Sequence, residues 1–299
     1  MSSLITNAFD MHVHSSPDVL KRKFNDLELA KRFTDAGMAG FCLKSHYFCT
    51  SERAELVRMV YPECNAVGAI CLNSTVGGLN AAAVELAAMS GARVVWLPTC
   101  DSKSERDEIF DENGDVKPGK KPPFWANIVL SLRDANIDCP RITLLDENGK
   151  LVPAMYDVLD TVAKRDLILA TGHASHEECF AVAKAAKERG VKRLLITHAT
   201  FPTTFYTVEE QKALIKLGAY IEHCYTTYST GKCDFNVIAE QIKAVGYENV
   251  VLGTDLGQPS NVYADEGLLA FSQSLVDYGF SEQQVMYMNG ELPKMLINP

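Results

Sequence analysis

The sequence lacks the features that would assign it to a membrane or a nucleic acid. No apolar run approaches the roughly 20 residues that span a bilayer, and the first ten residues, MSSLITNAFD, have neither part of a signal peptide. Basic residues are the minority, with 29 Lys and Arg against 38 Asp and Glu and a formal net charge of −9. Because nucleic acid and anionic membranes both attract a basic surface, we expect neither as a partner.

Cysteine patterns of disulfide scaffolds and zinc knuckles are also missing. The chain has nine cysteines, an odd number, and no pair has C-x-x-C spacing. Several lie in apolar, strand-like runs, as buried reduced thiols do. We therefore expect a soluble cytoplasmic protein that acts on a small molecule, and nothing in the sequence requires or forbids a homo-oligomer.

What the sequence does have is a repeated alternation of short apolar runs with longer amphipathic stretches, which is typical of successive βα units. Eight strands are predicted, at 8–14, 40–46, 66–72, 93–98, 167–173, 193–198, 219–224 and 249–255. The helices between and after them are predicted at 25–36, 51–60, 79–90, 155–165, 177–190, 208–217, 235–245, 264–278 and 281–296. At 299 residues the chain fits one α/β unit, a (β/α)8 TIM barrel that forms a single domain over 1–299.

The alternation is interrupted after the fourth strand by the long excursion 101–153, which is too long for an ordinary βα connection. It contains Gly- and Pro-rich turns and a predicted hairpin, 141–145 with 151–152, around Glu147-Asn148-Gly149. It could be a lid, an oligomer contact or an ornament. We favour a lid, with Phe124 and Trp125 enclosing a small, aromatic or cyclic substrate, because loops after barrel strands surround the active-site mouth.

The histidines are concentrated at the ends of the predicted strands. His12 and His14 project from the same side of the first strand, about 7 Å apart. Only His176 stands away from a strand end, while Asp255 ends the eighth strand. The C-terminal ends of barrel strands converge on one mouth, so this clustering predicts a metal site. The histidines at strand ends are His12, His14, His46, His173, His198 and His223.

Four motifs in this order resemble those of the amidohydrolase superfamily of metal-dependent hydrolases. They are His12-Val13-His14, Gly172-His173, Thr197-His198 and Gly253-Thr254-Asp255, and they extend over nearly the whole chain. The resemblance implies a divalent metal, held by His12, His14, His173 and Asp255. It gives His198 one of two roles, ligand of a second metal or partner of the metal-activated water.

The sequence departs from the binuclear members of that superfamily in one respect. Those often have a carboxylated Lys, or a Glu, at the end of the fourth strand. The corresponding segment here, 96–101, has neither, and Cys100 and Asp101 are its nearest possible ligands. One metal is therefore favoured over two, with zinc preferred and manganese or iron as alternatives.

Lys44 and His46 share one face of the second strand and are candidate substrate-binding residues. Lys44 could instead pair with a carboxylate such as Asp10. A histidine on this strand also resembles the polymerase-and-histidinol-phosphatase group of metal phosphoesterases. Those enzymes usually end in an Asp-x-His motif, whereas Asp255 is followed by Leu256 and Gly257, which favours the amidohydrolase resemblance.

Glu222 and His223 on the seventh strand are further candidates for substrate binding. They are adjacent, so only one can point inward, and Glu222 is slightly favoured. Tyr225, Tyr228 and Lys232 follow, where we expect a solvated loop rather than substrate contacts.

The combined prediction is a metal-dependent hydrolase in which activated water attacks an amide, cyclic amide or lactone carbonyl. Asp255 would take the proton from the water and pass it to the leaving group, and His198 would orient the water or polarise the carbonyl. Three alternatives stay open: a metal phosphoesterase with His46 as a ligand, a non-hydrolytic decarboxylase on the same barrel, and a barrel that binds metal or ligand without catalysis.

Overall fold

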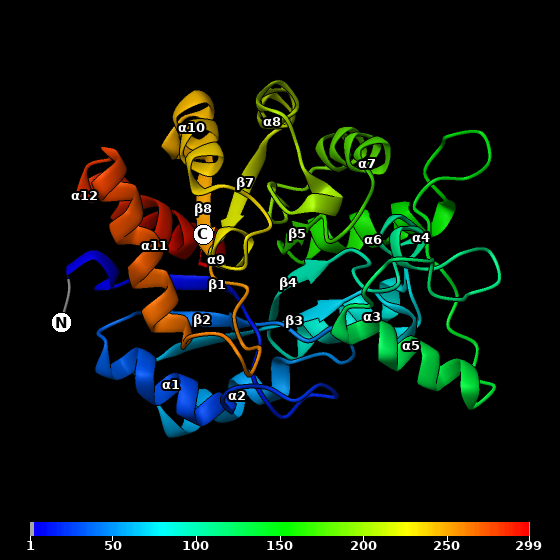
Figure 1. The fold of residues 1–299 in the computed structure, drawn as a ribbon, viewed down its shortest axis with the longest axis horizontal. Coiled ribbons are helices and arrows are strands. Elements are labelled where there is room, and N and C mark those ends of the chain that lie inside the picture. Colours follow the sequence, from blue (N-terminus) through cyan, green and yellow to red (C-terminus); the bar gives the residue numbers. More distant parts are fainter. Residues whose placement is uncertain (1–2, 299) are drawn as a thin grey trace.

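The computed structural model describes residues 3–298, and its eight parallel strands pair in sequence order from β1 to β8 (Figure 1). The sheet closes into a barrel beyond the ends of β8 and β1, where the Asp255 amide donates to the His12 carbonyl (2.7 Å) and the His14 amide donates to the Leu256 carbonyl (2.8 Å). The predicted α/β barrel is therefore confirmed. The strands are β1 Phe9–Val13, β2 Gly40–Leu43, β3 Asn65–Cys71, β4 Ala92–Trp96, β5 Ile168–Ala170, β6 Arg193–Ile196, β7 Ala219–Cys224 and β8 Val250–Gly253.

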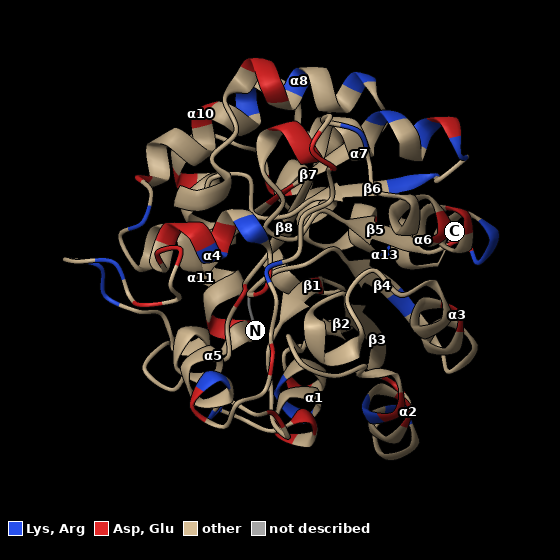
Figure 2. Cartoon of the chain, turned by 90° about the vertical axis from the view of Figure 1, so that its right-hand side faces the viewer, with Lys and Arg blue, Asp and Glu red and all other residues tan. Residues whose placement is uncertain are grey.

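Helices surround this ring on the outside, as Figure 2 shows in a view along the barrel. Those that follow the strands are α1 Asp26–Asp35, α2 Ser51–Val60, α3 Ala81–Met89, α6 Pro153–Lys164, α7 His176–Glu188, α8 Val208–Lys216, α10 Phe235–Val245 and α11 Ala264–Tyr278. Short 3₁₀ turns occur at η1 Ser3–Ile5, η2 Ser74–Val76, η3 Pro202–Thr204 and η4 Tyr247–Asn249.

The helix starts follow from local capping chemistry. The side chain of Asn25 accepts from the Glu28 amide, and Glu28 bonds back to the Asn25 amide, so α1 begins in a capping box. Thr207 and Glu210 make the same arrangement at α8.

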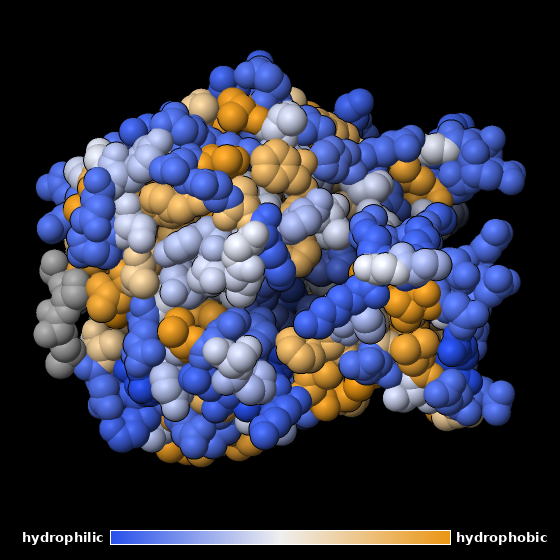
Figure 3. Space-filling view, in the orientation of Figure 1, coloured by the Kyte–Doolittle hydropathy of each residue, from blue (hydrophilic) through white to orange (hydrophobic). Residues whose placement is uncertain are grey.

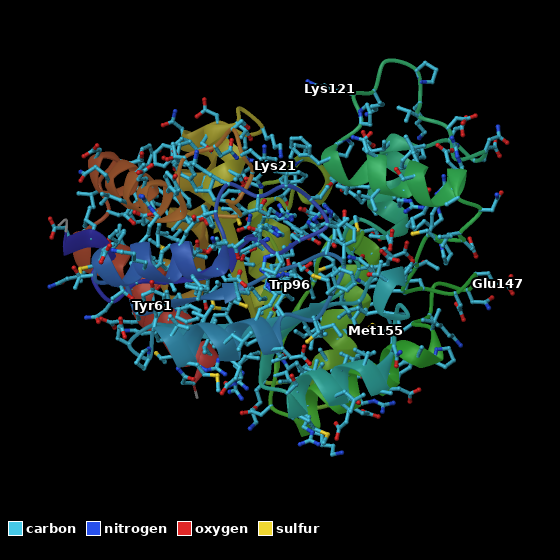
Figure 4. The ribbon with its side chains drawn as sticks, turned by 90° about the horizontal axis from the view of Figure 1, so that it is seen from below. Lys21, Tyr61, Trp96, Lys121, Glu147 and Met155 are labelled. Carbon is cyan, nitrogen blue, oxygen red and sulfur yellow. The ribbon has the colours of Figure 1, made fainter. Side chains whose placement is uncertain are left out.

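The barrel interior is packed rather than open. Alternate strand residues point inward and form one apolar cluster that includes Met11, Val94 and Trp96, and Figure 4 shows Trp96 near the centre of the molecule. Ile297 of the last helix belongs to the same cluster and accepts two hydrogen bonds from the Arg93 guanidinium at the start of β4. This helix therefore closes the N-terminal end of the barrel, and the C-terminal end is left for the site.

The C-terminal segment differs from the prediction of one helix over 281–296. It is divided into α12 Glu282–Met286, the π turn η5 Tyr287–Glu291 and α13 Leu292–Ile297. Pro293 has no amide hydrogen to continue a regular helical ladder, which accounts for the irregular turn before it.

The excursion 101–153 contains two helices that were not predicted, α4 Lys103–Ile109 and α5 Phe124–Asp134. Leu145 and Leu151 form an antiparallel bridge, which confirms the pairing of the predicted hairpin. Lys121 and Glu147 lie at the outer tips of this segment, away from the barrel (Figure 4).

The outer surface is mainly hydrophilic in the view of Figure 3, where a hollow separates the barrel body from the part of the excursion that carries α5. Over residues 3–298, no helix has the length and apolar character needed to cross a membrane.

Candidate metal centre

Three of the predicted ligands meet where β1 and β8 end. The Oδ1 atom of Asp255 lies 3.3 Å from Nε2 of His12 and 3.2 Å from Nε2 of His14. Their potential ligand atoms all lie within 4.8 Å of one another. Both imidazoles are buried, so the strand ends hold these donors in place with little access to water.

The other two predicted residues, His173 after β5 and His198 after β6, complete the cluster. Their Nε2 atoms are 3.1 Å apart. The ring of His198 also stacks on that of His12, with centroids 5.9 Å apart, so the two halves of the cluster are contiguous. The structure thus brings all five predicted metal-binding residues together.

Outer partners orient three of the imidazoles. Nδ1 of His12 lies 3.1 Å from the Glu222 carboxylate, and Nδ1 of His173 lies 3.2 Å from the Glu105 carboxylate. Nδ1 of His198 lies 3.1 Å from the hydroxyl of Thr204, which donates to the His198 carbonyl and so is left to accept at Nδ1. The contacts of His12 and His198 assign the proton to Nδ1 and leave Nε2 directed into the cluster, and the Glu105 carboxylate favours the same tautomer of His173.

The electrostatics favour neutral imidazoles beside an ionised carboxylate. Burial lowers the pKa of His14 and His198 well below the usual value for histidine. Burial alone would raise the pKa of Asp255, but the adjacent His12 and His14 outweigh it and hold that pKa well below its usual range. Neutral imidazole and carboxylate are the protonation states that bind a divalent metal.

This donor set fits a divalent cation. The Nε2 atoms of His173 and His198 face each other at 3.1 Å, so at most one proton can lie between them, whereas a divalent cation can use both lone pairs. The Asp255 oxygen and Nε2 of His12 lie 3.3 Å apart and add two further potential ligand atoms. Histidine with carboxylate suits zinc and its first-row neighbours.

The backbone at two of these residues is in the left-handed region, with φ of +28° at His198 and +51° at Asp255. Such conformations are costly for residues with a side chain and concentrate at functional sites. Gly172 before His173 has φ +58°, and a Cβ there would lie 2.3 Å from the Leu97 carbonyl oxygen. The side chains of His198 and Asp255 are therefore positioned by strained backbone conformations, and that of His173 by the close approach of Gly172 to the Leu97 carbonyl.

Four of the five clustered residues line a cavity of about 340 Å³, here called the mouth pocket; they are His14, His173, His198 and Asp255. Phe124 and Trp125 of α5 line its rim, so the excursion contributes to the pocket wall as a lid would. The other lining residues are Leu20, Arg22, Lys44, His46, Glu105, Pro123, Phe201, Thr226, Thr230, Lys232, Gln258, Ser260 and Asn261.

A protein-family model described as a family of unknown function, DUF6282, matches residues 7–222. The chain belongs to this family. The matched segment contains four of the five clustered residues, and Asp255 lies beyond it. No curated protein matches the chain.

Solved structures share the barrel of this DUF6282 protein at low sequence identity. An amidohydrolase from Pseudomonas aeruginosa has a TM-score of 0.61 and 9% identity over 98% of this chain and 96% of that one. The N-acetylglucosamine-6-phosphate deacetylase from Thermotoga maritima has a TM-score of 0.54 and 13% identity over 98% and 78%. A 2,6-dihydroxybenzoate decarboxylase has a TM-score of 0.53 and 9% identity over 98% of both chains. At these identities the likeness shows the fold alone.

Lys44 of the DUF6282 chain is buried, with its ammonium 2.8 Å from Nε2 of His12. Pairing with Asp10, the alternative interpretation, is wrong, because Asp10 accepts instead from the backbone amides of His12 and Thr254 and from the Thr254 hydroxyl. Lys44 therefore lies at the pocket floor beside a candidate ligand.

His46 also lines the pocket, where its ring stacks on His14 with centroids 5.0 Å apart. Its Nδ1 lies 2.8 Å from the Thr99 hydroxyl, and it does not join either group of potential ligands found among residues 3–298. Asp101 is paired with Arg106 at 2.8 Å, away from the cluster.

Glu222 and His223 lie on opposite faces of β7, and Glu222 is the inward one, as favoured. It contacts His12 and accepts from the His198 amide (2.9 Å), so it supports the cluster without lining the mouth pocket. His223 faces the other way, 3.5 Å from the Thr200 hydroxyl, and burial lowers its pKa to about 4. Direct substrate contact by His223 has no support in this geometry.

The segment after β7 is not the solvated loop that was expected. It forms α9, Tyr225–Ser229, in which Tyr225 and Tyr228 pack against Phe271. Only Lys232 of the three residues singled out there lines the mouth pocket.

Sequence reasoning missed Glu105, the carboxylate beside His173. It is 5% exposed and also accepts from the Thr203 hydroxyl at 2.7 Å. Although burial opposes it, the neighbouring His173 lowers the pKa of Glu105. Glu105 lies in the irregular excursion, where the sequence has no periodic pattern that would have singled it out. The one available signal was that it is an acidic residue near a predicted metal site.

Proposed function

We propose that this protein is a metal-dependent hydrolase of the amidohydrolase superfamily that acts on an amide, cyclic amide or lactone of a small molecule. The observation that carries the proposal is the convergence of four imidazoles and the Asp255 carboxylate at the barrel mouth. The order of the motifs along the strands supports the same superfamily.

His12, His14, His173 and Asp255 would hold one divalent ion, with zinc favoured, and His198 would serve as an added ligand or as a partner of water. When bound, such an ion lowers the pKa of water from 15.7 toward ~7 and polarises a carbonyl oxygen. Glu222 and Glu105 would hold His12 and His173 with Nε2 directed inward.

Asp255 would be the base that takes a proton from the attacking water and then delivers it to the leaving nitrogen or oxygen. Its Oδ1 faces the histidines, while the Thr226 hydroxyl donates to its Oδ2 (3.1 Å) and fixes the plane of the carboxylate. Neutral His198 would orient the water or stabilise the carbonyl oxygen. Lys44 and His46 would contact the substrate at the pocket floor.

The excursion would act as a lid over this pocket. Phe124 and Trp125 enclose its rim, and exclusion of water there would strengthen the interactions of the charged groups below. The pocket volume of about 340 Å³ suits a small molecule.

A non-hydrolytic decarboxylase is the second candidate. It is favoured by Lys232, a pocket cation that makes no ion pair among the described residues and so suits a carboxylate substrate. Release of CO2 without uptake of water would distinguish this reaction from hydrolysis.

The test is the substitution Asp255→Asn in zinc-loaded protein, assayed on a panel of aryl amides, cyclic amides and lactones. Loss of a general base is expected to lower kcat by a factor of about 10² to 10⁴. Asp160→Asn, which removes an exposed carboxylate on α6 paired with Arg189, is the control and should retain activity. Hydrolysis that survives in Asp255→Asn would contradict the mechanism.

A further inference from the structure

Among the described residues that line the mouth pocket, Lys232 is a cation that makes no ion pair. Lys232 lines the pocket and is exposed, and within residues 3–298 no carboxylate oxygen lies within 4.0 Å of its ammonium. Its packing partner is instead the ring of Phe201, whose centroid is 4.1 Å from Nζ.

The other two cations of the pocket already have partners. The Arg22 guanidinium donates to the Asp18 carboxylate at 2.8 and 2.7 Å, and the Asp18 side chain is fully buried by this pairing. The Lys44 ammonium lies against Nε2 of His12. Lys232 is therefore the pocket cation without a direct ion-pair partner, although it is close enough to Glu105 to help lower the pKa of that carboxyl group.

Phe201 connects Lys232 to the metal centre. Its ring centroid lies 4.8 Å from that of His198 and 6.1 Å from that of His173. A ligand group that contacts the Lys232 ammonium is thus separated from the histidine cluster by the ring of Phe201. The charged group of the ligand that Lys232 would bind therefore lies apart from the ligand bond that would be cleaved at the cluster.

Apolar surface faces this position from the rim. Phe124 lines the pocket and is 63% exposed, so most of its ring is open to solvent. Trp125 beside it is instead packed against Phe110, with centroids 6.0 Å apart. An open aromatic face beside an unpaired ammonium is complementary to a molecule that is apolar at its centre and anionic at one end.

We propose that Lys232 forms an oxyanion subsite, which binds a carboxylate or phosphate group of a substrate whose apolar, ring-bearing part contacts Phe124 and Phe201. The inference rests on the proposed function only in taking the mouth pocket as the substrate site. The anionic group is remote from the carbonyl that reacts, and its binding would orient that carbonyl over the histidine cluster.

The experiment measures equilibrium binding by calorimetry with three probes, phenylacetate, benzylphosphonate and the neutral isostere phenylacetamide, on zinc-loaded protein at low salt. Since partly exposed charge pairs are weak, we expect the wild type to prefer an anionic probe over phenylacetamide by about fivefold. The preference should shrink in high salt. Whichever oxyanion binds more tightly identifies the favoured group.

Lys232→Gln should abolish the preference, and Lys232→Arg should retain it. Lys184→Gln, which removes an exposed lysine of α7 outside the pocket, should behave as the wild type. Equal binding of all probes by the wild type, a preference that persists in Lys232→Gln, or no binding of any probe would overturn the inference. Because binding needs no turnover, a charge preference without hydrolysis would refute the proposed function alone, and hydrolysis without a charge preference would refute the subsite alone.

Discussion

Removing the charge of Glu105 tests whether the excursion serves the metal centre. Glu105→Gln keeps the size of a side chain that is 5% exposed and can still accept from the Thr203 hydroxyl. It replaces the carboxylate that lies 3.2 Å from Nδ1 of His173. The substitution should weaken the hold on the His173 tautomer that directs Nε2 into the cluster.

The magnitude follows from the role of such partners. Loss of the carboxylate behind a metal-binding histidine costs about 10- to 100-fold in metal affinity, which corresponds to about 1.4 to 2.7 kcal/mol. Because Glu105 and His173 are both buried, the effect should persist in high salt, unlike that of an exposed pair. The assay is competition for zinc against a chromophoric chelator at fixed pH.

The barrel provides a matched control in the His176–Glu210 pair, which joins α7 to α8 at 2.7 Å outside the mouth pocket. Glu210→Gln changes the same chemistry without touching the cluster and should leave zinc affinity unchanged. Unaltered affinity in Glu105→Gln, or an equal loss in both variants, would refute the positioning role.

Three further substitutions test the surroundings of the cluster. Lys44→Met removes a positive charge 2.8 Å from Nε2 of His12. Because this charge would repel a bound metal ion, zinc affinity should rise at least ~10-fold. A fall in affinity would mean that Lys44 supports metal binding. Burial raises the pKa of Asp10 from 3.8 to about 7, so its protonated form stabilises the fold at low pH and this stabilisation is lost as pH rises toward 7. Urea unfolding of metal-free protein should therefore show the wild type losing roughly 2–3 kcal/mol of stability relative to Asp10→Asn between about pH 5 and 8. Parallel pH profiles of the two proteins would contradict this. Gly172→Ala places a Cβ 2.3 Å from the Leu97 carbonyl oxygen at φ +58°, and should destabilise the protein by ~3 kcal/mol or more in the same assay; a neutral effect would show that the backbone can move there.

The regular part of the fold was predictable because its sequence signals are local. The predicted helix 51–60 has the bounds of α2, and strand 219–224 has those of β7. Apolar periodicity and capping residues carry this information, since a strand or helix must bury one face wherever it packs. Predicted strands ran a few residues past the observed ends, as at 167–173 against Ile168–Ala170, because the metal-centre residues follow the strands in extended or turn conformations.

The excursion was not predictable in the same way. Helix α4 has seven residues, and α5 follows the Pro- and Lys-rich run that ends at Pro123, so neither has a strong periodic signal. The part Glu105 plays beside His173 is a tertiary contact that no local pattern specifies. The strand ends pointed to the five clustered residues together with His46 and His223, and the resemblance to the amidohydrolase motifs separated the two sets. The position of Lys44 against His12 depends on the register of the neighbouring strands β1 and β2.

The most direct test of the central claim is the metal content per chain, measured by plasma mass spectrometry on protein purified without added metal or chelator. The account predicts about one equivalent of a divalent metal, with zinc favoured. The double variant His12→Ala/His14→Ala should lose this metal, whereas His176→Ala, which lies outside the cluster, should retain it. Absence of metal under every loading condition, or full metal content in the double variant, would contradict the account.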